Sequence, residues 1–338
     1  MTLNKLILLL LFISCACFQS GDQGGGSSSN GGSISTNGNN CGFERPPFIS
    51  KFILSDKDVY FFGLHAKPDN VFYELNMLDD VIIETVGDYT SENVVALGDF
   101  NADCDYLSDF AYNSLDLVSR GFSFPIGKNA DTNVASTSCA YDVFATHLFD
   151  ISYSNPKIYS GISSNISDHF PIELSLVAGE QTYKVIAFNM QRYGPTKAND
   201  SQFISYVIDL VSGADITLLQ EITSTDQSIM ERLVPSGYKY AISSRLGSTS
   251  YKEQYMYVYK ENLSLTDAYV YSGTICVPEV GNTNSGGSGG SGGSNTSNSC
   301  TSDGYYCGLD LYTTPGGQCR SRNKNGENKR VRDCCCGF

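Results

Sequence analysis

The stretch NVVALGDFN, residues 93–101, is an apolar run that ends at a carboxylate and an amide. The run has the length and composition of a buried β-strand, and Asp99 and Asn101 follow it one residue apart. A simple turn after a strand would account for either residue alone. The stretch therefore predicts a strand that delivers polar side chains to one edge of a sheet.

Three more apolar runs end in the same way, at a polar residue. They are 59–64 before His65, 183–188 before Asn189, and 215–219 before Gln220 and Glu221. A carboxylate at the end of an apolar strand is costly unless it is paired or binds a metal ion. Strand ends carry the sites of many α/β folds, so these polar residues are candidates for one site.

Helical patterns separate these strands. Apolar residues recur at helical spacing over 71–86, and Asp200 or Ser201 caps a second helix that reaches about residue 212. Two later segments, 238–243 and 254–259, alternate in the manner of strands. The alternation predicts an α/β domain whose sheets are covered by helices.

The length of 338 residues allows one globular domain of about 240 residues with accessory pieces. Lys5 precedes an apolar run too short to cross a bilayer, which predicts a secretory signal peptide. Segments made mostly of Gly, Ser, Asn and Thr predict flexible linkers. The predicted organisation is a signal peptide (1–20), a linker (21–40), a globular domain (41–279), a second linker (280–299) and a cysteine-rich, basic mini-domain (300–338).

Twelve cysteines agree with an oxidising compartment, so we predict a secreted protein. A lipid-modified Cys15 or Cys17, followed by the Gly/Ser tether, is the alternative and would anchor a bacterial lipoprotein at the cell surface. The net charge of −14 argues against a generic nucleic-acid binder, which would carry a basic patch. It leaves open a nuclease that meets phosphates through bound divalent cations.

Two of the three histidines lie in suggestive settings, His65 at a strand end and His169 in a Ser-Asp-His triplet. Each alone is more often a structural histidine, and His147 matches no motif and is predicted to be structural. Together with the strand-end residues and the SYKEQY segment that carries Glu253, they indicate a catalytic site.

Six motifs resemble those of deoxyribonuclease I, within the endonuclease/exonuclease/phosphatase superfamily. They are GDFNADC (98–104), SCAYD (138–142), SDHFPIEL (167–174), VIAFNMQRYG (185–194), LLQEI (218–222) and SYKEQY (250–255). The resemblance covers nearly all of 41–279. It implies a four-layer α/β sandwich of two packed, mainly antiparallel β-sheets flanked by helices, with a small disulfide-rich C-terminal module added here.

The order of the motifs differs from that of the family. The group that comes second in the family occupies 41–176 here, and the group that comes first occupies 183–279. This order is a circular permutation, in which 177–182 joins the family's old termini. The strands at 170–176 and 183–188 are therefore expected to lie close together, since near termini make permutation tolerable.

The resemblance also implies two disulfides. Cys41 and Cys276 match two closely spaced cysteines of the family's opened loop, so a Cys41–Cys276 bond would staple the new ends. The second family disulfide maps onto Cys104 and Cys139.

Hydrolysis of a phosphodiester needs an activated water, neutralisation of the developing charge and a proton for the leaving oxygen. Imidazoles suit the proton transfers, and hard oxygen ligands suit Mg²⁺ or Mn²⁺. The resemblance implies that His65 and His169 are the acid–base pair, held by Glu253 and Asp142 respectively. The residues implied at the metal ion and scissile phosphate are Glu221, Asp99, Asp168, Asn189 and Asn101, and those implied at the DNA are Arg45, Tyr251 and Tyr141.

Several positions depart from the family pattern. Thr223 replaces an arginine, Gln254 replaces a residue that is often basic, and Ser248-Thr249 replaces a basic/amide pair. Fewer cationic contacts predict weaker duplex binding or altered sequence preference with the chemistry retained.

A calcium ion is implied at Asp131 and Thr137, which match a structural calcium site of the family. The departures at Asn133 and Ala135 place that site in question.

The C-terminal piece, 300–338, holds six cysteines, which allow fifteen pairings. Arg320–Phe338 has six basic residues against two acidic ones, so a solvated loop face and an anchor for DNA, polyanions or glycans are both open.

The prediction is a monomeric, secreted endonuclease acting on double-stranded DNA. The alternatives are a superfamily phosphodiesterase of lipid phosphates and a catalytically inactive surface-binding relative.

Overall fold

A computed structural model describes residues 39–128, 130–273 and 275–278. It also describes three short strands of the C-terminal region, which form their own antiparallel sheet: β14 (Tyr312–Thr313), β15 (Cys319–Arg322) and β16 (Asn328–Arg330). The predicted signal peptide, the second linker and the rest of the C-terminal module lie outside the described residues. Among the described residues, no helix has the length and apolar composition needed to cross a bilayer.

A five-stranded sheet has the order β12-β2-β3-β4-β5. Its strands are β12 (Ser264–Val270), β2 (Phe48–Leu54), β3 (Lys57–Gly63), β4 (Asn93–Asp99) and β5 (Asp142–His147). Only the β3–β4 pair in this sheet is parallel, and helix α1 (Val71–Val86) lies between these two strands in the chain. The predicted strands at 59–64 and 93–97 and the predicted helix over 71–86 are therefore confirmed.

A six-stranded sheet has the order β10-β11-β9-β8-β7-β6. Its strands are β10 (Tyr238–Ile242), β11 (Gln254–Lys260), β9 (Ile216–Ile222), β8 (Gln181–Tyr193), β7 (Ile172–Ala178) and β6 (Ser152–Ile158). Again one pair is parallel, β8–β9, connected through α4 (Pro195–Ala198) and α5 (Ser201–Ser212). Asp200 is the residue that caps α5, since its carboxylate accepts the N–H groups of Gln202 and Phe203.

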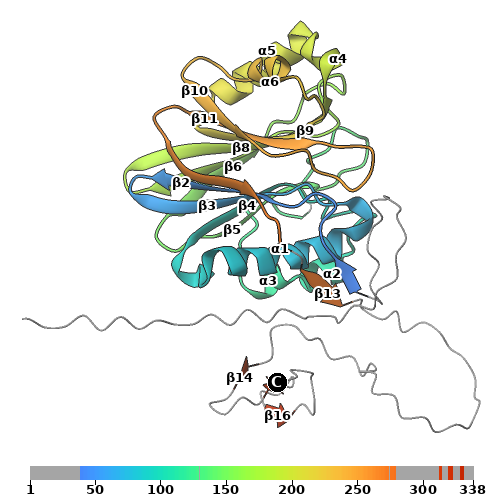
Figure 1. Ribbon diagram of the computed structural model, residues 1–338, viewed down its shortest axis with the longest axis vertical. Helices are drawn as coiled ribbons and strands as arrows, with labels where there is room; N and C mark the ends of the chain where they lie inside the picture. The colour runs from blue at the N-terminus through green and yellow to red at the C-terminus, as the bar shows by residue number, and fades with distance from the viewer. Residues whose placement is uncertain are drawn as a thin grey trace, which may run out of the picture. The chain divides into compact units, whose positions relative to one another are not determined.

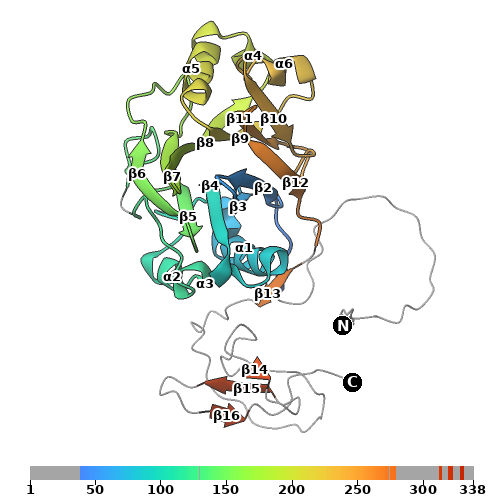
Figure 2. The same cartoon turned by 90° about the vertical axis from the view of Figure 1, so that its left-hand side faces the viewer.

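The two sheets pack face to face, and helices cover their outer faces, giving four layers (Figures 1 and 2). Phe52, Phe61 and Leu218 belong to the core between the sheets. Helix α1, with the short α2 (Asp109–Asn113) and α3 (Asp116–Ser119), packs on the five-stranded sheet, and α5 with α6 (Gln227–Glu231) packs on the other. This is the predicted arrangement of two packed, mainly antiparallel sheets flanked by helices.

Strands β7 and β8 form a hairpin, so the predicted closeness of 170–176 and 183–188 is confirmed. The ladder runs from Ile172 opposite Ala187 to Ala178 opposite Gln181. The two-residue turn between them begins with Gly179, whose φ of +59° is in the left-handed region that glycine adopts without strain.

The two ends of the domain meet in a short antiparallel ladder of β1 (Asn39–Cys41) and β13 (Cys276–Pro278), in which Cys41 stands opposite Cys276. The next pair along the ladder is hydrogen-bonded, because the Gly42 N–H donates to the Ile275 carbonyl at 3.0 Å. Cys41 and Cys276 are therefore a non-hydrogen-bonded pair, the pairing with the closer Cα atoms.

Candidate active site

The candidate site lies where the parallel strands of both sheets end. His65 follows β3 and Asp99 ends β4, while Asn189 and Glu221 lie near the ends of β8 and β9. The carboxyl ends of parallel strands share one edge, and β4 contacts both β8 and β9 across the two sheets. The four strand-end residues named in the sequence are thereby brought together.

Two imidazoles face one carboxylate oxygen. The Nε2 atoms of His65 and His169 lie 3.4 Å and 3.5 Å from Oδ2 of Asp99. On the far side of each ring, Nδ1 is 2.7 Å from a buried carboxylate, Glu253 for His65 and Asp142 for His169. A carboxylate at Nδ1 favours the tautomer with its proton there, so Nε2 of a neutral ring is free to accept a proton.

Buried side chains fix the backbone around His65. The His65 N–H donates to the Tyr255 hydroxyl at 2.9 Å. Arg45 donates to the carbonyls of His65 (2.9 Å) and Ala66 (3.2 Å), and its Nε lies 3.6 Å from Glu253. Arg45 is only 8% exposed, so its guanidinium holds the segment that carries His65 instead of facing solvent.

Short polar side chains fix His169 and its partner. The Ser167 hydroxyl donates to the Asn189 carbonyl at 2.7 Å and accepts the His169 N–H at 3.1 Å. The Thr132 hydroxyl oxygen accepts the N–H groups of Tyr141 and Asp142. The segment that carries His169 is thus tied to β8, and the segment that carries Thr132 is tied to the start of β5.

The position of Asp99 depends on a buried amide and a glycine. The Gln220 side chain accepts the Asp99 N–H at 2.9 Å and donates to the Leu64 carbonyl at 2.8 Å, linking the two sheets. A Cβ on Gly98 would lie 2.3 Å from that carbonyl and 2.7 Å from the Gln220 amide nitrogen, and φ there is +128°. Only glycine allows this approach.

Asn189 joins the two metal-ligand candidates. Its amide donates to Asp99 at 3.0 Å and to Glu221 at 3.1 Å. The Tyr251 hydroxyl donates to the other Glu221 oxygen at 3.0 Å. Asn101 turns back onto the same cluster, since its N–H donates to Asp99 at 3.1 Å.

The electrostatics of the site are dominated by carboxylates. Burial lowers the pKa of His169, but Asp142 and Asp99 outweigh it and raise the pKa to about 10. Burial also lowers the pKa of His65, and Glu253 and Asp99 raise it further than burial lowers it. Burial raises the pKa of Asp142 to about 6 against the opposing effect of His169.

The donor set fits a hard divalent cation. Asp99 and Glu221 are carboxylates bridged by one neutral amide, and Asp142 and Glu253 add negative charge behind the imidazoles. One tight group of ligand atoms, within 4.8 Å of one another, comes from His65, Glu221 and Glu253. His65 and Glu253 already hydrogen-bond each other, so we favour Glu221 with Asp99, because Mg²⁺ prefers oxygen ligands.

The remaining predicted residues lie around this centre. The Asp168 side chain is 54% exposed, and one of its oxygens lies 3.8 Å from His169 Nε2. The Tyr141 ring lies 6.3 Å from the His169 ring and 5.4 Å from Tyr106. His147 packs between the rings of Tyr89 and Phe122, away from the site, as a structural histidine would.

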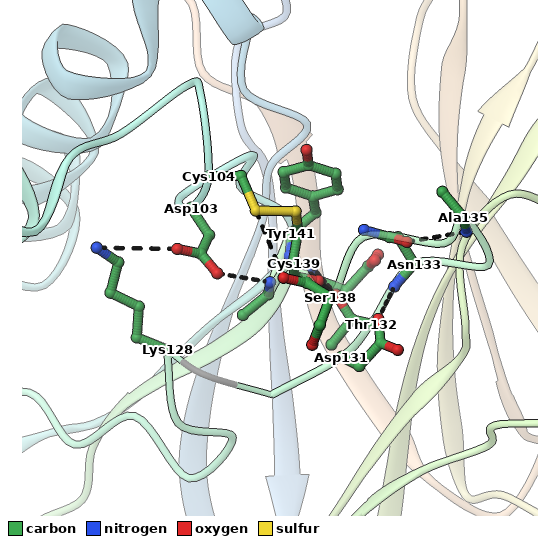
Figure 3. The surroundings of a disulfide bond; sticks show 12 residues. Asp103, Cys104, Lys128, Asp131, Thr132, Asn133, Ala135, Ser138, Cys139 and Tyr141 are labelled. Carbon is green, nitrogen blue, oxygen red and sulfur yellow. Dashed lines mark hydrogen bonds and ion pairs between the residues drawn. A yellow bond between two sulfur atoms is a disulfide. The ribbon is translucent and has the colours of Figure 1, made fainter.

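The Cys104–Cys139 disulfide is formed and closes the loop that precedes Tyr141 (Figure 3). Asp131, the predicted calcium ligand in this loop, accepts the N–H of Asn133 at 3.4 Å. Within the described residues no hydrogen bond joins Asp131 to Thr137, and both are exposed.

Three supporting residues were given no specific role from the sequence. Gln220 and Tyr255 lie in quoted motifs, but their contacts run to distant segments. Lys197 of α4 donates to the carbonyls of Ile166 (2.8 Å) and Met190 (2.7 Å), holding the segments before Ser167 and after Asn189. Its position after a turn gave no signal of this role.

Proteins similar in sequence include deoxyribonucleases. The chain is 34% identical over 164 residues to deoxyribonuclease-1-like 1 of Cricetulus griseus, covering 44% of this chain and 53% of that protein. It is 36% identical over 150 residues to the Rattus norvegicus protein of that name (40% and 48%). It is 34% identical over 154 residues to deoxyribonuclease-1 of Ovis aries (40% and 59%). The chain thus has partial homologues in the deoxyribonuclease I family and spans about half of their length.

No family model matches the chain. Solved structures that match include D. rerio TDP2 complexed with single strand DNA product, at 9% identity and a TM-score of 0.38 over 60% of this chain and 84% of that one. The human Nocturnin catalytic domain matches at 9% identity and a TM-score of 0.37 over 68% and 89%. With TM-scores below 0.5, the case for function rests on the side chains and the sequence relatives.

Proposed function

We propose that this chain is a divalent-metal-dependent endonuclease that hydrolyses phosphodiester bonds of double-stranded DNA. One observation carries the proposal: two imidazoles, each held at Nδ1 by its own carboxylate, present Nε2 to the same oxygen of Asp99. Such a pair can supply one general acid and one general base. The partial deoxyribonuclease relatives favour DNA as the substrate.

In this mechanism one imidazole takes a proton from the attacking water through Nε2, and the other gives a proton to the leaving oxygen. Glu253 and Asp142 orient the rings and stabilise the imidazolium form. Glu221 and Asp99, with Asn189, Asn101 and Asp168, would hold Mg²⁺ or Mn²⁺, which when bound neutralises charge on the scissile phosphate. Asn189 orients both carboxylates.

A plasmid-nicking assay with and without EDTA tests the proposal. We expect nicking of supercoiled DNA in Mg²⁺, none in EDTA, and losses of at least about 10²-fold for His65→Ala and His169→Ala. Full activity in chelator would rule out the metal, and wild-type rates in either variant would rule out its role. Sphingomyelin, assayed in parallel, distinguishes a lipid phosphodiesterase.

The family's motif order is, in our proposal, circularly permuted in this chain. The β7–β8 hairpin supports it, since this is where the family's old termini would be joined. The β1–β13 ladder supports it at the new ends, and the partial match to each relative is what a continuous alignment of a permuted chain gives. A chain that begins at Gln181, joins 278 to 39 directly and ends at Ala178 should fold and retain activity; failure to fold would count against the permutation.

Secretion is likewise a proposal. The Cys104–Cys139 disulfide supports an oxidising compartment. The residues of the predicted signal peptide lie outside the described part of the chain. Detection of a mature N-terminus beyond residue 14 in the culture medium of an expressing host would support it, and an uncleaved intracellular product would count against it.

A further inference from the structure

Arg192 is held beside the site by an irregular backbone. The register of β8 against β9 shifts between Asn189 and Tyr193, and Gln191 and Arg192 both have left-handed φ values, 48° and 60°. Residues other than glycine rarely adopt such values, so neighbouring contacts must hold this backbone. β-bulges next to active sites re-aim a side chain, and here the bulge turns Arg192 out of the strand pattern.

Two contacts fix this arginine against the site. Its N–H donates to Oε2 of Glu221 at 3.0 Å, the same oxygen that accepts the Tyr251 hydroxyl at 3.0 Å. Its guanidinium carbon lies 5.4 Å from the centroid of the Tyr251 ring. A guanidinium stacked on a ring keeps its N–H edges available for an anion.

Most of the other cations around the site are already committed. Four of them donate to backbone carbonyl oxygens, namely Arg45, Lys197, Arg245 and Lys252. Lys67, two residues after His65, is exposed too, and within the described part of the chain its ammonium makes no ion pair, so it is an uncommitted cation on the His65 side of the site. The Arg192 side chain is exposed, and within the described part of the chain it makes no ion pair and its guanidinium donates no hydrogen bond.

We infer that Arg192 and Tyr251 form a subsite for a non-scissile phosphate of the nucleic-acid backbone, on the Glu221 side of the site. An acidic chain with a net charge of −14 repels DNA, so an uncommitted guanidinium beside the site is the group that a phosphate would meet. The inference rests on the proposed function and names one contact of its substrate.

The experiment compares Arg192→Gln with the wild type and with Lys239→Gln. Lys239 lies on β10, the edge strand of the same sheet, and its replacement removes one positive charge in the same way. The glutamine keeps the Arg192 backbone N–H that binds Glu221. Binding is measured in Mg²⁺ across a salt series with a 20-base-pair phosphorothioate duplex, which resists cleavage. Turnover is measured with bis(4-nitrophenyl) phosphate, which has no neighbouring phosphate.

We expect Arg192→Gln to raise the Kd for the duplex about tenfold at low salt and to reduce the slope of log K against log salt by roughly one. Turnover of the small diester should be unchanged. The Kd of Arg192→Lys should lie between those of the wild type and Arg192→Gln, and the Kd of Lys239→Gln should match that of the wild type. An unchanged Kd and slope, or an equal loss in Lys239→Gln, would overturn the subsite. Loss of small-diester turnover would overturn it too, since Arg192 would then act on the cleaved phosphate.

The outcomes separate this inference from the proposed function. A wild-type protein that binds the duplex through Arg192 but does not nick plasmid keeps the subsite and refutes the nuclease. If the wild type nicks plasmid and Arg192→Gln binds the duplex with the same Kd and salt slope as the wild type, the nuclease stands and the subsite is refuted. A protein that neither binds nor cuts DNA refutes both.

Discussion

Oε2 of Glu74 accepts the backbone N–H of Lys67 at 3.0 Å, which ties the first turn of α1 to the segment that carries His65. Oε1 of the same carboxylate accepts the N–H of Glu44 at 2.9 Å, so Glu74 also holds the chain that carries Arg45. Burial raises the pKa of Glu74 to about 7 despite these two bonds. A buried carboxylate outside the catalytic set therefore links stability to pH.

The folded-state pKa of Glu74, about 7, lies above the value of 4.5 expected in the unfolded chain. Its contribution to stability is therefore fully present below pH 4.5 and is lost as the pH rises through 7. We expect the free energy of unfolding of the wild type, relative to Glu74→Gln, to fall by about 3 kcal/mol across this range and to stay constant above it. Urea unfolding of both proteins from pH 4.5 to 8 measures this; parallel curves would contradict it.

Replacing either carboxylate behind the imidazoles should slow the chemistry. In Asp142→Asn and Glu253→Gln the amide can donate to Nδ1 and favour the wrong tautomer of His169 or His65, so we expect kcat to fall by about 10²–10⁴-fold. Nicking rates at saturating DNA measure this. Asp150→Asn, a surface carboxylate paired with Lys57, is the control and should retain full activity. A kcat within twofold of wild type in either variant would refute the orienting role.

The Cys104–Cys139 disulfide closes a loop of sequence separation 35 that leads into Tyr141 and Asp142. The chain-entropy model gives about 4 kcal/mol for a loop of this length. The double variant Cys104→Ser/Cys139→Ser should lose stability of this order in urea unfolding, and added reductant should shift its midpoint less than it shifts that of the wild type. A wild-type midpoint that is itself insensitive to reductant would show that the bond contributes nothing.

The second predicted disulfide joins Cys41 and Cys276, which stand opposite each other in the β1–β13 ladder. The Cα separation of a non-hydrogen-bonded antiparallel pair, about 4.5 Å, lies within the disulfide range. Non-reducing peptide mapping should return one cross-linked peptide that contains both cysteines. Closing this long loop should stabilise the domain by roughly 4–5 kcal/mol. A disulfide between either cysteine and the C-terminal module would refute the predicted Cys41–Cys276 bond.

Truncation after Glu279 should leave turnover on short, soluble DNA nearly unchanged, because the predicted catalytic residues lie between Arg45 and Glu253. If the basic residues of 320–338 anchor the enzyme, the same truncation should weaken retention on high-molecular-weight DNA, less so as salt rises. Both activities are measured for full-length and truncated protein across a salt series. Equal retention of full-length and truncated protein at low salt would show that the module does not anchor the enzyme. Loss of turnover on short, soluble DNA would show that the predicted domain boundary at residue 279 is wrong.

Local pattern determined most of the elements. Apolar runs of strand length predicted β3, β4, β8 and β9, and the carboxylate of Asp200 predicted the start of α5. These predictions succeed because strand burial and helix capping depend on only a few neighbouring residues. The same runs placed His65, Asp99, Asn189 and Glu221 at strand ends. The chemistry of these residue types, together with the motifs, predicted one site, and the fold brings them together.

Only the tertiary structure decided which polar side chains are committed to hydrogen bonds within the protein and which remain available to a ligand. His65 and Glu253 are 188 positions apart, and Gln220 reaches Leu64 across 156, distances over which no local pattern operates. Arg45 and Arg192 are the same residue type, yet the first is buried against two carbonyls and the second is exposed on a tyrosine ring. Burial and hydrogen bonding are set by neighbours from other strands, so the fold decides which arginine is available to a phosphate.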